Sequence, residues 1–128
     1  MSETGNTKIL YDVKKFLDRD PEEEDTFFDT IIIGNINTCI AELAHQGGLK
    51  NVGDFSVVTG DETWDDYLGE SELYLLAFVK AYVQIGTKLT FDPPQSSSLC
   101  SALEEKYKKT LFNIQTQIEL HNIESEDQ

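Results

Sequence analysis

The chain has 128 residues with 24 acidic and 10 basic side chains, so its formal net charge is −14 and its pI is near 4.3. This length suits one domain, and 39% hydrophobic residues are enough for a packed core. The acidity argues against direct binding to nucleic acid, whose phosphates recruit clusters of Lys and Arg, and against binding to an anionic membrane surface. No secretion signal is expected, because no basic stretch precedes an apolar segment at the N-terminus. No apolar run approaches the ~20 residues that cross a bilayer.

A first helix is predicted over residues 6–17, because apolar side chains recur there at three- and four-residue steps and share one face. The acidic run 18–25 follows, and Pro21 within it disfavours helix at Asp20. We interpret this run as a solvated connector whose carboxylates complement the positive end of the next helix.

A second, longer helix is predicted from Asp25 or Thr26 to about Gln46, and Gly47-Gly48 ends it. Its apolar face is wide, which implies burial against more than one neighbour. The face consists of Phe28, Ile32, Ile36, Ile40 and Leu43, widened by Phe27, Ile31, Cys39 and Ala44.

The connection over residues 49–69 is long for a small helical domain, a property typical of functional or mobile loops. Within it, residues 55–59 are β-prone and could form a hairpin or lie extended, and residues 63–68 look like one turn of helix. Trp64 in this turn has two interpretations. It either anchors the connection to the core, which is the usual place for the only Trp of a domain, or it lies at a protein interface, where Trp is enriched.

A third long helix is predicted from Glu70 or Ser71 to Leu89, and the paired prolines of residues 91–94 end it. A last helix with a narrow apolar stripe is predicted over about residues 98–120.

The acidic segment 121–128 is expected to be a flexible tail, because Ile123 is its only hydrophobic anchor. The predicted fold class is all-α, with a single domain over residues 1–128. It is a small helical bundle of about four helices, with one long structured loop between the second and third long helices.

Catalytic and metal-binding constellations are not evident in the sequence. His45 and His121 are isolated, and Cys39 and Cys100 have no metal-ligand spacing. Each cysteine falls in a helical pattern, which favours a buried thiol over a disulfide. No enzyme activity, cofactor or metal is therefore expected. An acidic set in the long connection lacks the ligand spacing of an EF-hand; it comprises Asp54, Asp61, Glu62, Asp65 and Asp66.

Two elements together carry a family resemblance: Thr-Trp-Asp-Asp-Tyr-Leu-Gly at residues 63–69, and Phe-Asp-Pro-Pro-Gln-Ser-Ser-Ser at residues 91–98 before an amphipathic last helix. Upstream, a short helix ends in Lys-Lys-Phe-Leu at residues 14–17, and an acidic break leads to a long helix that ends in Gly47-Gly48. From about Ile9 to Glu119 the chain resembles the head–tail connector (head-completion, or adaptor) proteins of long-tailed bacteriophages.

The resemblance implies a virion structural protein at the head–tail interface, assembled in the host cytoplasm as a ring, a dodecamer like the portal above it. The implied partners are the portal protein, a tail-side connector or stopper protein, and further copies of the chain. DNA would pass through the ring without sequence-specific binding, and no membrane is involved.

The resemblance also implies that residues 111–128 contact the portal and that residues 54–66 face ring neighbours or the channel. It implies no catalytic residue. The candidate interface residues are Trp64, Asp65, Asp66, Leu111, Ile114, Ile118 and Ile123.

An alternative of another class remains open, namely an acidic DNA mimic that binds and inhibits a host nucleic-acid-binding protein. The net charge of −14 favours it. Lysines that interrupt any continuous acidic face count against it; these are Lys14, Lys15, Lys106, Lys108 and Lys109.

Overall fold

The computed structural model describes residues 6–49 and 54–126. Within these ranges the chain is all-α, as predicted, and the only β-type pairing is an isolated bridge between Lys8 and Thr63. Residues 55–59 form no hairpin there. The helices are α1 (Ile9–Phe16), α2 (Thr26–His45), α3 (Trp64–Leu68), the 3-10 helix η2 (Leu73–Leu75), α4 (Leu76–Phe91) and α5 (Ser97–Glu126).

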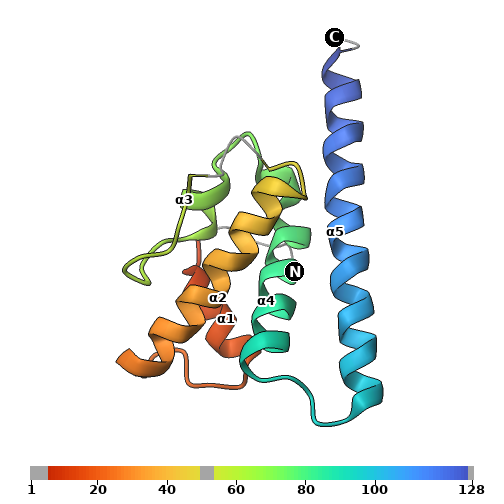
Figure 1. The fold of residues 1–128 in the computed structure, drawn as a ribbon. Coiled ribbons are helices and arrows are strands. Elements are labelled where there is room, and N and C mark those ends of the chain that lie inside the picture. The colour runs from red at the N-terminus through yellow and green to blue at the C-terminus, as the bar shows by residue number, and fades with distance from the viewer. Residues whose placement is uncertain (1–5, 50–53, 127–128) are drawn as a thin grey trace.

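The helices α2 and α4 pack on each other at the centre of the fold, α1 contacts both of them, and α5 packs on α4 (Figure 1). Side chains that the sequence placed on the apolar stripes fill the core between them. They include Ile32, Ile36, Ile40 and Leu43 of α2, Val79, Tyr82 and Val83 of α4, and Ile114 of α5.

The helix α2 begins and ends where the sequence predicts. The Asp25 side chain accepts a hydrogen bond from the backbone N–H of Phe28 at 3.1 Å, and Gly48 follows the helix with φ +90°. By length and mean hydropathy (1.2), α2 could cross a membrane. However, its polar groups bond to the rest of the fold: Asn37 to the backbone of Val57, and Glu42 to two tyrosines. These contacts are typical of a core helix.

The helix α1 begins at Ile9 rather than at residue 6, and two further helix boundaries differ from the prediction by five or six residues. The helix α4 begins at Leu76 rather than at Glu70 or Ser71, because Gly69 (φ +62°) and η2 reverse the chain after α3. The helix α5 continues past Leu120 to Glu126, so most of the segment predicted to be a tail is helical. Residues 127–128 of that segment lie outside the described residues.

The three long helices meet closely at Gly86 of α4. A Cβ there would lie 2.5 Å from Sγ of Cys39 and 2.7 Å from Cε1 of Tyr107, so only glycine fits this crossing. Beside it, the hydroxyls of Tyr82 and Tyr107 both donate to Oε2 of Glu42 at 2.7 Å. These bonds join α2, α4 and α5 through one carboxylate.

Both cysteines are unpaired, and Cys39 is buried as predicted. Burial raises the pKa of the Cys39 thiol to about 12. Cys39 is therefore protonated at neutral pH and behaves as a small apolar side chain.

Candidate functional site

The residues predicted to form an interface differ in their exposure to solvent. Trp64 and Ile114 are fully buried, so neither offers its side chain to a partner in this fold. Leu111 and Ile118 are half-buried against the core. The side chains exposed to solvent are those of Asp65, Asp66 and Ile123, and for these three an interface role stays a prediction.

The core interpretation of Trp64 is thereby confirmed. Its indole Nε1–H donates to Oδ2 of Asp12 on α1 at 2.8 Å. The same oxygen accepts from the Thr7 hydroxyl at 2.6 Å and lies 3.3 Å from Nζ of Lys80 on α4. Trp64 thus pins the long connection to α1 and α4.

Asp66 is exposed to solvent, but it also stabilises the start of α3. Its backbone N–H donates to Oγ1 of Thr63 at 3.1 Å, and its carboxylate accepts from the Thr63 backbone N–H at 3.0 Å. This reciprocal pair is a capping box, which starts α3 directly at Trp64. The acidic motif is therefore explained in part by helix capping.

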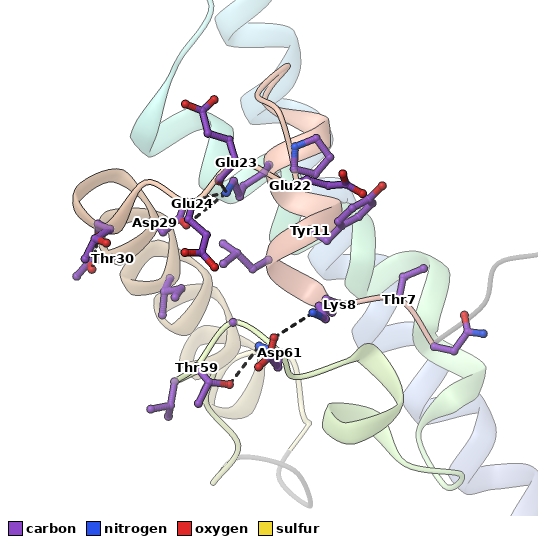
Figure 2. Close-up of a pocket in the computed structure, with 18 residues that line it drawn as sticks. Thr7, Lys8, Tyr11, Glu22, Glu23, Glu24, Asp29, Thr30, Thr59 and Asp61 are labelled. Carbon is purple, nitrogen blue, oxygen red and sulfur yellow. Dashed lines mark hydrogen bonds and ion pairs between the residues drawn. The ribbon is translucent and has the colours of Figure 1, made fainter.

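An open groove of about 850 Å³ lies on the α1 side of the molecule (Figure 2). Its walls are α1, the acidic segment 21–24, the first half of α2 and the loop 58–61. Leu10, Ile33 and Val58 supply its apolar surface. The sequence did not indicate this groove, because its walls come from three separate parts of the chain.

Unpaired negative charge gathers on one side of the groove. Lys8 pairs with Asp61 and Lys14 with Asp29, each with a 3.0 Å contact. The carboxylates of Glu22, Glu23 and Glu24 are exposed, and none of the lysines in the groove pairs with them. Figure 2 shows these three glutamates across the groove from Thr59 and Asp61.

Glu62 shapes the loop wall of the groove. Its carboxylate accepts from the backbone N–H groups of Val58, Thr59 and Gly60 at 2.9, 3.1 and 3.0 Å. Partial burial opposes ionisation, but these hydrogen bonds outweigh it and lower the pKa of Glu62 to about 2. These hydrogen bonds close the loop, and in the closed loop the Val58 side chain is 73% exposed to solvent.

The outward face of α5 is a second surface that the other described residues leave exposed. Phe112 is 64% exposed, and Lys108 and Lys109 lie one turn before it on the same side of the helix. Further along α5, Leu120 and Ile123 are about half exposed. Figure 1 shows that this end of α5 runs beyond the start of α4.

A third apolar surface lies where α2 begins. The sequence placed Phe27 and Phe28 on the core face, but Phe27 is largely exposed and Phe28 is partly so. The Phe28 ring packs edge-on against Phe91 of α4 at 5.9 Å, and the Arg19 guanidinium lies 4.8 Å from its centre. These aromatic residues therefore form a surface cluster.

The two histidines have different surroundings in the structure. His45 is exposed in the last turn of α2, and His121 stacks on Tyr74 with ring centres 4.1 Å apart. Among the residues that the structure describes, no three His, Cys, Asp or Glu side chains are grouped as metal ligands.

The comparison with protein families identifies the class of protein. A model of the phage connector protein family matches residues 9–121, which span α1 through most of α5. The chain therefore belongs to the phage connector protein family, and the resemblance seen in its sequence is confirmed. Searches of curated proteins and of solved structures each gave no significant match.

Proposed function

We propose that this connector forms a ring beneath the portal, joins the DNA-filled head to the tail and extends the DNA channel. The observation that carries the proposal is the family match over residues 9–121. A connector is a structural component of the virion, so the protein acts by binding other phage head and tail proteins rather than by catalysis.

The charge of the chain supports a channel role. A net charge of −14 repels the phosphate backbone, so DNA can slide past the ring without adhering to it. Exposed carboxylates that could repel DNA in this way include Asp54, Asp65 and Glu70, which lie between α2 and α4.

The end of α5 is the part of the chain that we assign to the portal. Leu120 and Ile123 are 49% and 52% exposed near the end of α5, which runs beyond the start of α4. Exposed apolar side chains on a projecting helix are typical of a helix that docks in a groove of a partner.

The test is electron microscopy of lysates from a phage with an amber codon in place of the Trp64 codon. Separate heads and tails, with DNA lost from the heads, are the expected result. Growth on an amber-suppressor host that inserts Trp is the matched control and should restore tailed particles. Normal tailed particles in the non-suppressing host would contradict the proposal.

The acidic DNA mimic is the rival function, favoured by the net charge alone. On α5 the exposed Lys106, Lys108 and Lys109 interrupt the acidic surface, which counts against mimicry of a phosphate backbone. Capture of a host nuclease or polymerase by the purified chain, together with normal particles from the amber phage, would favour the rival.

A further inference from the structure

Two complementary surfaces lie on different sides of the subunit. The groove opens on the side of α1 and α2, whereas α5 packs on α4 with its outward face turned away from the bundle (Figures 1 and 2). One surface is concave and acidic, and the other is convex and carries lysines. Neither surface is covered by the residues that the structure describes.

The charges of the two surfaces match. Among the described residues, no lysine pairs with the carboxylates of Glu22, Glu23 and Glu24 in the groove. Three of the ten basic side chains of the protein lie within residues 106–109 of α5, and they outnumber the two neighbouring acidic side chains, Glu104 and Glu105. Charge complementarity of this kind steers association and fixes the register of two docking surfaces.

The apolar groups match as well. Phe112 stands 64% exposed one turn after Lys108 and Lys109, and Val58 in the groove wall is 73% exposed. A groove of about 850 Å³ has ample room for one aromatic side chain. An aromatic anchor between charged residues is a frequent centre of binding energy at interfaces.

From these matches we propose that the Lys108–Lys109–Phe112 face of α5 in one copy docks into the acidic groove of the next copy. The inference rests on the proposed ring, and it names the contact that would close it. Because the two surfaces differ and lie on different sides of the subunit, the contact is head-to-tail. Head-to-tail contacts generate rings when the rotation between copies closes.

Two charge-reversed variants test the contact. The first carries Lys108→Glu and Lys109→Glu, so its groove and its α5 face are both acidic. The second carries Glu22→Lys, Glu23→Lys and Glu24→Lys, so both of its surfaces are basic. Each variant alone should associate about tenfold or more weakly than the wild-type chain in sedimentation velocity at low salt.

A mixture of the two variants should restore the wild-type assembly, because every contact between unlike copies joins an acidic surface to a basic one. The control replaces the second variant by Asp54→Lys, Asp65→Lys and Glu70→Lys, which makes the same change in net charge away from the groove. The control variant keeps both contact surfaces of the wild type, so in this mixture it should assemble by itself and leave the Lys108→Glu, Lys109→Glu variant unassembled. Failure of the test mixture, or a wild-type chain that stays monomeric across the concentration series, would overturn the inference.

A matched pair of substitutions tests the apolar part of the contact. Phe112 and Leu99 are both 64% exposed on α5, but only Phe112 lies beside the two lysines. Phe112→Ser should weaken association about tenfold, whereas Leu99→Ser should leave it unchanged. Equal effects of the two substitutions would contradict a role for Phe112 as the anchor.

The same proteins should be tested for binding to purified portal protein. The mixture of the two charge-reversed variants could bind portal protein and yet fail to assemble. That result would overturn the proposed contact between copies, but it would not contradict the proposed function. A wild-type chain that fails to bind portal would contradict the proposed function instead.

Discussion

The indole N–H of Trp64 donates to Oδ2 of Asp12, a residue 52 positions earlier in the chain, at 2.8 Å. The same carboxylate oxygen lies 3.3 Å from Nζ of Lys80. One acidic group therefore joins α1, α3 and α4, and the Lys80 ammonium lies 5.9 Å from the centre of the Trp64 ring. This junction holds the long connection to the bundle, together with the hydrogen bonds between Asn37 and the Val57 backbone.

Trp64→Ala should therefore lower the free energy of unfolding by about 3–5 kcal/mol, because the substitution opens a cavity and removes a hydrogen-bond donor. Trp64→Phe keeps most of the packing and should cost clearly less. Urea denaturation followed by circular dichroism measures both. A midpoint for Trp64→Ala within error of the wild-type value would contradict the buried position of this side chain.

Gly86→Ala should destabilise the fold by about 1–3 kcal/mol, since the added Cβ meets Cys39 and Tyr107 at less than van der Waals distance. Gly34→Ala is the matched control, because no atom lies within 4 Å of a Cβ at that helical position. That substitution should stabilise the protein by up to about 1 kcal/mol through helix propensity. Thermal unfolding compares the two, and equal shifts in Tm would show that the crossing at Gly86 is looser than described.

Glu62 should contribute to acid sensitivity. Its pKa is lowered in the folded state to about 2, so its contribution to stability is present above its unfolded pKa of roughly 4.3 and is lost as the pH falls towards 2. Glu62→Gln should make the dependence of stability on pH shallower in that window. Chemical denaturation at several pH values measures the slope, with the exposed Glu24→Gln as the control. An identical slope in Glu62→Gln and wild type would contradict the role of the Glu62 carboxylate as acceptor of the loop hydrogen bonds.

Deletion of residues 121–128 should weaken portal binding while leaving the bundle folded. The deletion removes the exposed Ile123 and the stacking of His121 on Tyr74, but no fully buried side chain among the described residues. A pull-down with purified portal protein and a far-ultraviolet spectrum separate the two effects. The milder variant Ile123→Ser should act in the same direction, and undiminished capture of both proteins would exclude this segment as the portal contact.

Local signals in the sequence were enough to predict the helices. Asp25 before an apolar stripe and Gly47-Gly48 after it located α2, and the one-turn pattern of residues 63–68, with Trp64 and Leu68 four positions apart, located α3. The start of α4 was predicted too early because Glu70 and Ser71 are compatible with a helix. The chain instead has to turn there so that Leu75 reaches the core, which is a tertiary requirement.

The candidate surfaces were harder to predict, because exposure depends on which helices pack together. Ile114 and Phe112 are both apolar residues of α5, yet one is fully buried and the other is 64% exposed. The acidic run at residues 22–24 was interpreted as a solvated connector, and its proximity to Val58 depends on a fold that periodicity does not specify.

Because α5 is one continuous helix, the direction of the side chains at its end depends on the number of residues before them. A helix of 30 residues extends about 45 Å, and each inserted residue turns everything beyond it by about 100°. A one-residue insertion between Phe112 and Ile123 would thus swing Ile123 to another side of the helix, whereas a four-residue insertion would nearly preserve its direction and lift it by about 6 Å. Among related chains, length variation in this stretch should therefore occur in steps close to whole helical turns.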